Sequence, residues 1–155
     1  MTGVDPSPQM LKIAKAKLRQ YSNIQLTEGL VSNLSVDEKY HAATLLLVLH
    51  FLSDDGTKLD LLTAISKRLD YNTPLIIADI FGTTAELQHN LNVLKGLLQE
   101  KVSTKDIARR FQKIQTQIHY ISEERLAILL EEAGFSAPVR IFQSTIYGGW
   151  ICRKK

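Results

Sequence analysis

The stretch that decides the fold class is Ala42–His50, which reads Ala-Ala-Thr-Leu-Leu-Leu-Val-Leu-His. Apart from Thr44, its first eight residues are apolar, which is typical of a strand buried on both faces of a parallel sheet. A second apolar stretch, Pro74–Ile80, predicts another such strand. Between the two, apolar residues recur at helical spacing over Leu59–Leu69. The order strand, helix, strand indicates a parallel α/β unit.

The segments on either side continue this alternation. Ser7 is a suitable helix N-cap, and Pro8 follows at the first helical position, so an amphipathic helix is predicted over Pro8–Gln20. The last two strands, Val139–Gln143 and Ile146–Cys152, are joined by too few residues for a helical crossover and are expected to be antiparallel. The other predicted elements are strands at Thr2–Asp5 and Ile24–Glu28 and helices at Thr84–Lys101, at Thr104–His119 and between Ser122 and Gly134.

Together these elements predict an α/β fold, with a mostly parallel sheet, helices on both faces and a C-terminal antiparallel hairpin. The length of 155 residues fits one domain, residues 1–155. Right-handed crossovers place the carboxyl ends of the parallel strands at one rim, which is where open α/β sheets bind ligands. Asp5, Glu28–Val31, His50 and Asp79 map to this rim.

The composition excludes several classes of protein. An apolar fraction of 45% is ordinary for a globular core, and the net charge of +3 is scattered, so neither disorder nor a dedicated nucleic-acid binder is indicated. A single cysteine cannot form an internal disulfide and points to a reducing compartment. The N-terminus lacks the pattern of a signal peptide, and no apolar run approaches the roughly 20 residues of a membrane helix. A cytoplasmic location without membrane association is therefore expected.

The familiar catalytic motifs do not occur in the chain. None of the four histidines is spaced as a zinc ligand, so no metal site is expected. There is no nucleophile elbow, no phosphate-binding loop and no Gly-x-Gly sequence.

One segment resembles a known family. Gly3–Leu11, which reads Gly-Val-Asp-Pro-Ser-Pro-Gln-Met-Leu, is similar to the second strand and following helix of class I S-adenosylmethionine-dependent methyltransferases. The family's acidic residue at the end of that strand binds both ribose hydroxyls of the cofactor, which implies this role for Asp5. Other segments resemble later parts of the same fold in the right order, and these are Tyr40–Leu52, Asp70–Asp79, Ala133-Gly134-Phe135, Phe142-Gln143 and Gly148-Gly149-Trp150.

The resemblance implies a Rossmann-like methyltransferase fold and S-adenosyl-L-methionine as the cofactor. It implies that His50 lies near the reacting methyl group as the candidate catalytic residue, and that Arg109 or Arg110 contacts the substrate. The acid that usually binds the adenine is replaced, which leaves the backbone of Leu30 and Val31. The residues implied in cofactor binding are Asp5, Pro6, Met10, Leu30, Val31, Leu49 and His50.

Within the family, the branch of carboxy-S-adenosylmethionine synthases of tRNA wobble-uridine modification is the most similar. It shares the Asp-x-Ser-Pro-x-Met pattern that begins at Asp5. However, Leu46 stands where that branch has a cofactor-contacting asparagine, and Phe111 where it has an arginine. These two differences favour ordinary methyl transfer, to a small molecule or an RNA-related acceptor.

The family's first strand and its glycine-rich loop have no counterpart, because Met1 directly precedes the segment that resembles the second strand. The resemblance therefore implies an N-terminally truncated domain, and a sheet without its central first strand would have two apolar edges. One alternative is a non-catalytic module that self-associates through these edges, and a homo-oligomer is expected. A nucleotide-binding oxidoreductase domain is a third reading, since Asp5 could bind a nicotinamide ribose equally well, although the closing hairpin disfavours it.

Overall fold

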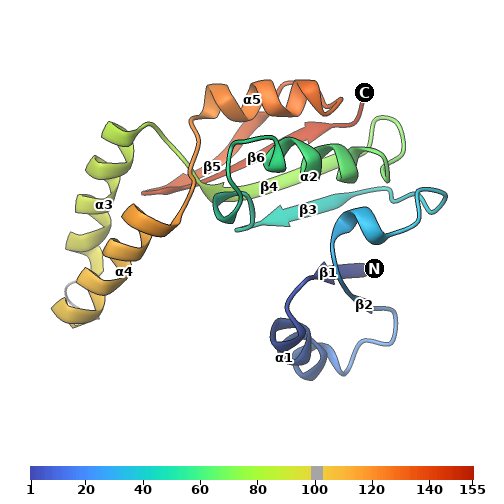
Figure 1. Ribbon diagram of the computed structural model, residues 1–155, viewed down its shortest axis with the longest axis horizontal. Coiled ribbons are helices and arrows are strands. Elements are labelled where there is room, and N and C mark those ends of the chain that lie inside the picture. The colour runs from blue at the N-terminus through green and yellow to red at the C-terminus, as the bar shows by residue number, and fades with distance from the viewer. Residues whose placement is uncertain (99–102) are drawn as a thin grey trace. The chain divides into compact units, whose positions relative to one another are not determined.

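A computed structural model describes residues 1–98 and 103–155 of the chain (Figure 1). The chain forms two compact units, which comprise residues 1–38 and 39–155.

The first unit is a small strand–helix–strand unit. Strand β1 (Thr2–Asp5) pairs in parallel with β2 (Gln25–Glu28), so that Asp5 lies opposite Glu28 at their carboxyl ends. Helix α1 (Pro8–Leu18) connects them, and a single 3-10 turn, η1 (Val31–Asn33), follows β2. The predicted helix start is confirmed, because the Ser7 hydroxyl accepts a hydrogen bond from Met10 N and Pro8 is the first helical residue. The helix ends two residues before the predicted Gln20.

The second unit contains a four-stranded sheet in the order β3–β4–β6–β5 (Figure 1). Strands β3 (Ala43–Leu46) and β4 (Pro74–Ile80) are parallel. Strand β6 (Tyr147–Arg153) is antiparallel to both β4 and β5 (Val139–Ser144), which confirms the predicted C-terminal hairpin. Among the described residues, no strand pairs with the outer edge of β3.

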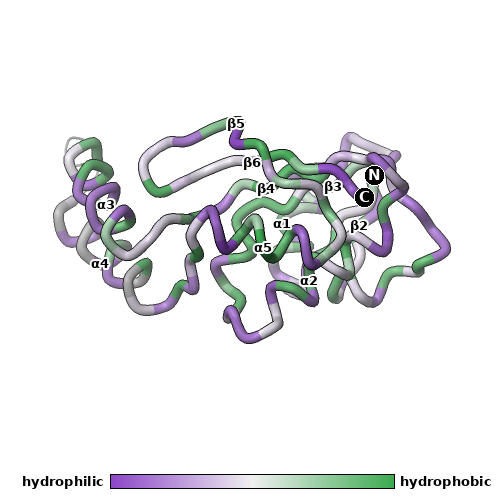
Figure 2. Tube along the Cα trace, turned by 90° about the horizontal axis from the view of Figure 1, so that it is seen from above, coloured by the Kyte–Doolittle hydropathy of each residue, from purple (hydrophilic) through white to green (hydrophobic). Residues whose placement is uncertain are grey.

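Helices α2 (Thr57–Ser66) and α5 (Glu123–Glu132) lie on one side of this sheet (Figure 2). Alternate residues of β4 face them, and Leu75 and Ile77 are fully buried. Trp150 of β6 and Leu130 of α5 complete this apolar layer. The residues between them in the strands point to the opposite face, where Leu46 is 54% exposed and Ile76 is 36% exposed.

Helices α3 (Thr84–Leu98) and α4 (Thr104–Gln117) form a separate pair beyond the end of β4 (Figure 1). Leu87 and Leu91 of α3 pack with Ile80 and Ile146, and Phe111 of α4 packs against this cluster. The start of each helix agrees with the prediction. The last three residues of the first predicted helix, 99–101, lie outside the described part of the chain.

The strand predicted over Ala42–His50 is wrong at its C-terminal end. Strand β3 stops at Leu46, because Leu47 has a positive φ of 57° and the chain turns into the 3-10 helix η2 (Leu49–Phe51). The carboxylate of Asp79 accepts hydrogen bonds from Val48 N and Leu49 N, and these bonds replace continued pairing in the sheet. The α/β fold class itself is confirmed.

Candidate active site

In the first unit, Asp5 ends β1 and its side chain is partly buried. Its Oδ1 accepts a hydrogen bond from Ser7 N at 2.7 Å, and its carbonyl accepts one from Gly29 N at 3.2 Å. Among the described residues, Oδ2 has no hydrogen-bond partner. The carboxylate is therefore oriented by the chain but keeps one oxygen for a ligand, which fits the implied binding of a ribose diol.

The neighbouring residues implied in cofactor binding lie shortly after the ends of β1 and β2, in the segments that include the first turn of α1 and the turn η1. Pro6 and Met10 are exposed at the start of α1, and Leu30 is exposed beside the half-buried Val31. The amide of Leu30 already donates to Asn33 Oδ1 at 2.8 Å, so this N–H is engaged within the turn. Asp5, Pro6, Met10, Leu30 and Val31 all belong to this unit, whereas Leu49 and His50 belong to the other. Their roles stay predictions.

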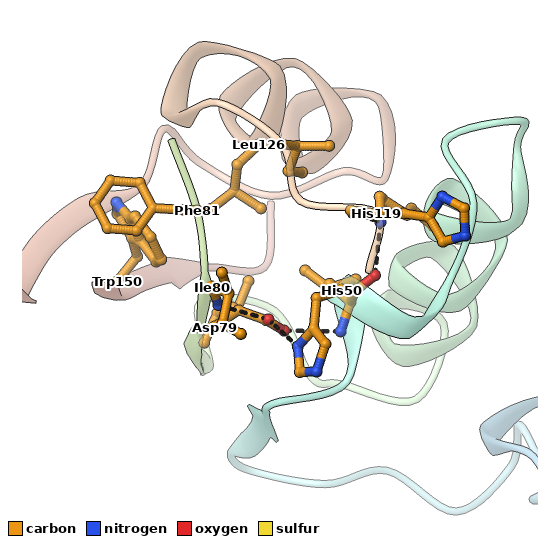
Figure 3. A pocket seen from close by; sticks show the side chains of 11 residues that line it. His50, Asp79, Ile80, Phe81, His119, Leu126 and Trp150 are labelled. Atoms are coloured by element: carbon orange, nitrogen blue, oxygen red, sulfur yellow. Dashed lines mark hydrogen bonds and ion pairs between the residues drawn. The ribbon is translucent and has the colours of Figure 1, made fainter. Parts of the chain in front are cut away.

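In the second unit, His50 and Asp79 form a buried pair (Figure 3). Their Nδ1 and Oδ1 atoms lie 2.5 Å apart, and each side chain is less than a tenth exposed. The carboxylate is anchored by three backbone amides, since Oδ2 accepts from Val48 N and Leu49 N and Oδ1 accepts from Ile80 N. Since a carboxylate can only accept, Nδ1 carries the proton of this hydrogen bond.

The other ring nitrogen of His50 is turned away from Asp79 (Figure 3). In the described part of the chain, no group forms a hydrogen bond with Nε2. The phenol oxygen of Tyr40 is the one fully buried side-chain nitrogen or oxygen atom without a partner there, so Nε2 is not fully buried. Nε2 is the ring nitrogen that can exchange a proton with a bound molecule, because Nδ1 is held by Asp79.

Lys58, in the first turn of α2, lines the same small cavity as this pair and is fully buried. Its ammonium donates to three backbone carbonyls, those of Leu49 at 2.6 Å, Leu52 at 2.5 Å and His119 at 2.7 Å. Burial lowers the pKa of Lys58 from its usual 10.5, and the nearby carboxylates of Asp54 and Asp79 oppose that shift.

A small cavity lies between the His50–Asp79 pair, Lys58 and the aromatic residues Phe81 and Trp150 (Figure 3). It encloses about 10 Å³, which is room for about one water molecule. A nucleoside or a methyl acceptor cannot fit in this cavity. A ligand of His50 would therefore have to bind outside it, at Nε2, because Nδ1 is held by Asp79.

The arginines implied in substrate binding lie on α4. Arg109 is exposed, and no hydrogen bond or ion pair joins it to another described residue. The side chain of Arg110 lies outside the described residues. The structure therefore does not bring Arg109 to the His50–Asp79 pair, and the role of Arg110 stays a prediction.

Sequence reasoning did not single out Lys58 and treated Asp79 only as a residue of the rim. Both show the same signal, a charged residue at a position where the periodic pattern calls for an apolar one. Lys58 falls on the helical stripe of Leu62 and Ile65, and Asp79 falls on the alternating buried positions Leu75 and Ile77.

Neither a metal site nor a membrane-spanning helix has a candidate within the described ranges, residues 1–98 and 103–155. No three His, Cys, Asp or Glu side chains there gather as ligands for a metal ion. None of the helices in those ranges has the length and apolar character needed to cross a membrane.

Comparison with known proteins supports the same fold. Residues 1–67 match a family model described as a methyltransferase domain. No curated protein sequence matches the chain significantly.

Solved structures match the chain along nearly its whole length. A protein described as a possible exported protein from Bordetella parapertussis is 18% identical with a TM-score of 0.70, and the match covers 99% of this chain and 52% of that one. The N-methyltransferase NodS from Bradyrhizobium japonicum, solved with S-adenosyl-L-homocysteine, is 16% identical with a TM-score of 0.65, and the match covers 99% and 65%. Human N-acetylserotonin methyltransferase, solved with S-adenosylmethionine, is 18% identical with a TM-score of 0.65, and the match covers 99% and 40%.

The fold is thus the Rossmann-like α/β fold of S-adenosylmethionine-dependent methyltransferases, with a methyltransferase-domain match over its first 67 residues. The chain spans between 40% and 65% of the length of these three solved structures.

Proposed function

We propose that this chain is part of an S-adenosylmethionine-dependent methyltransferase whose general base is His50, aligned by Asp79. The observation that carries the proposal is the buried 2.5 Å contact between these two side chains, which holds Nδ1 of His50 and leaves Nε2 without a hydrogen-bond partner among the described residues. The methyltransferase-domain match and the methyltransferase fold support the family part of the proposal. The acceptor class stays broad and includes small molecules and RNA-related acceptors.

S-adenosyl-L-methionine supplies an electrophilic methyl group on its sulfonium. In our proposal the free carboxylate oxygen of Asp5 accepts hydrogen bonds from the ribose hydroxyls, and Pro6 and Met10, which follow β1, lie beside the cofactor. The backbone of Val31, with Leu30, borders the adenine. Leu49 and His50 border the reacting end.

The role of His50 follows from the demands of an in-line displacement. Such a transfer depends mainly on alignment, and it needs a base where the acceptor is a poor nucleophile such as a hydroxyl. Asp79 holds the proton on Nδ1, so Nε2 has the lone pair that can accept the acceptor's proton. Arg109 and Arg110 on α4 are proposed contacts for an anionic group of the acceptor.

Two residues disfavour the chemistry of carboxy-S-adenosylmethionine synthases. Leu46 is an exposed aliphatic residue of β3, and Phe111 packs against the apolar cluster of α3. Neither supplies the amide or guanidinium group of that branch.

A cytoplasmic location stays a prediction that rests on the single cysteine, Cys152, which is a free thiol.

The experiment that tests the proposal is methyl transfer from radiolabelled S-adenosylmethionine, supplied at millimolar concentration to a panel of hydroxyl and amine acceptors and RNA. We expect His50→Ala to lower transfer to hydroxyl acceptors by about 100-fold, which is typical of the loss of a general base. His119→Ala is the matched control, since the His119 side chain is exposed and its backbone bonds survive the substitution. Equal transfer by wild type and His50→Ala would contradict the role of His50.

A second candidate function is a module that self-associates through a sheet edge, and the unpaired edge of β3 favours it. This strand carries no charged residue, and Leu46 is 54% exposed. The opposite edge strand, β5, is less suited to pairing, because it contains an irregularity between Arg140 and Phe142 and exposes a charge.

Light scattering at increasing protein concentration tests this second candidate. We expect a dimer or larger species that dissociates when Leu46→Lys places a charge on the edge. Met10→Lys, which alters an equally exposed apolar residue of the first unit, is the control and should leave association unchanged. A strict monomer at high concentration would rule out association through β3.

A further inference from the structure

We propose that Lys58 is a positioning residue, which fixes the turn that carries His50 and ties that turn to the segment that returns from α4. The inference rests on the proposed function, because it assigns Lys58 a task only if His50 is the base. It is carried by the three hydrogen bonds of the Lys58 ammonium group.

All three protons of the Lys58 ammonium are used. Nζ lies 2.6 Å from Leu49 O, 2.5 Å from Leu52 O and 2.7 Å from His119 O, and the side chain is 0% exposed. These carbonyls come from the two ends of the His50 turn and from a segment more than 60 positions further along the chain. One buried cation thus joins three backbone sites.

The turn is held at both ends by opposite charges. At its start, Asp79 accepts hydrogen bonds from Val48 N and Leu49 N. At its end, Lys58 donates to the carbonyl of Leu52, and it also donates to the carbonyl of Leu49, which accepts a second hydrogen bond from Leu52 N. The anion thus accepts from the first amides of the turn and the cation donates to the carbonyl at its end, which is the favourable arrangement of charges at the two ends of a helical turn. His50 lies between them, so its backbone has little freedom.

The same ammonium connects this turn to the chain that leaves α4. His119 N donates to His50 O at 2.8 Å, while His119 O accepts from Lys58. The backbone nitrogen of His119 therefore binds His50, and its carbonyl oxygen binds Lys58. We call Lys58 with its three carbonyl acceptors the Lys58 clamp. The α3–α4 pair, which carries the proposed acceptor contact Arg109, is in this way linked to the base by backbone hydrogen bonds.

A neutral apolar side chain cannot donate the three hydrogen bonds that Lys58 donates. A buried ammonium is expensive to desolvate, and burial lowers the pKa of Lys58 accordingly. Methionine matches its length and volume, but it would remove the ammonium donor from the Leu52 and His119 carbonyls and leave the Leu49 carbonyl with Leu52 N alone. The carbonyls would then turn toward water, and the turn that holds His50 would lose its geometry.

The test compares Lys58→Met with Lys67→Met, a substitution of an exposed lysine at the end of the same helix. The readout is nuclear magnetic resonance of the intact chain, without substrate. In the wild type we expect a downfield Nδ1–H resonance from the His50–Asp79 hydrogen bond and slow exchange of the His119 amide. Lys58→Met should abolish or broaden that resonance and speed the amide exchange by at least about tenfold. Lys67→Met should change neither.

A folded Lys58→Met chain with an unchanged His50 resonance and unchanged His119 exchange would overturn the proposal. If Lys58→Met does not fold, proton exchange of the Lys58 ammonium is measured in the wild type instead. The three hydrogen bonds of Nζ predict that this exchange is slow. Exchange as fast as that of exposed lysines would also overturn it. Because no readout requires methyl transfer, the failure of the proposed function and the failure of the Lys58 clamp appear in different measurements.

Discussion

Cys152 and Lys58 are both buried in the second unit, and burial favours the neutral form of each side chain. Burial raises the pKa of the Cys152 thiol to about 12, whereas it lowers the pKa of Lys58. The two side chains differ in the number of polar partners that they have. Lys58 has three carbonyl acceptors and nearby carboxylates, while Cys152 has a single long contact from its sulfur to Leu75 O at 3.8 Å.

The raised pKa of Cys152 predicts an inert thiol in the folded protein. At pH 8 the folded chain holds Cys152 almost entirely as the neutral thiol, because the thiolate forms only as the pH approaches about 12. We expect little alkylation by iodoacetamide at pH 8 and complete alkylation after denaturation, as measured by mass spectrometry. Labelling of the native chain at the rate of the denatured chain would contradict this burial.

At the level of elements, Asp54 and Arg125 join the segment before α2 to helix α5. Arg125 donates from Nε and from its second terminal nitrogen to the two carboxylate oxygens, at 2.8 and 2.9 Å. The hydrogen bond from Arg125 lowers the pKa of Asp54 below its usual 3.8. A carboxylate with a lowered pKa stabilises the fold above its unfolded pKa, and this contribution disappears as the pH falls through the folded value.

We therefore expect Asp54→Asn to destabilise the chain by up to about 1 kcal/mol at pH 7, because the pair is partly exposed and screened by solvent. The difference from the wild type should shrink below pH 3.8, where Asp54 begins to be protonated in the unfolded wild type. Urea unfolding at pH 7 and at pH 3 measures both values. Asp37→Asn, which changes an exposed aspartate of the first unit, serves as the control. A difference of equal size at both pH values would show that the carboxylate charge is not responsible.

Local patterns predicted most elements, and long-range contacts account for what they missed. Ser7 and Ser122 were identified as helix caps because capping depends on residues three positions apart. The early end of β3 could not be read locally, because it depends on Asp79, which lies 30 positions beyond Leu49. The clamp by Lys58 likewise requires the carbonyl of His119, 61 positions away. The candidate base His50 was identified from the sequence, but its alignment by Asp79 was not.

At the scale of the whole chain, the strands form two separate sheets among the described residues, β1–β2 and β3–β4–β6–β5. The assignment of both units to a single methyltransferase domain stays a prediction. Solved structures with the methyltransferase fold match 99% of the chain.

The measurement that tests the central claim most directly is calorimetric titration of the chain with S-adenosylmethionine. Because the sequence has no Gly-x-Gly to bring the backbone close to the cofactor, we expect weak binding, with a Kd above about 1 μM. Asp5→Asn should weaken that binding by about tenfold or more, since a charged acceptor for the ribose is lost, whereas Asp37→Asn should not. Equal affinity of the wild type and Asp5→Asn would contradict the proposed cofactor site, and sub-micromolar binding would contradict the expectation that the chain binds the cofactor weakly.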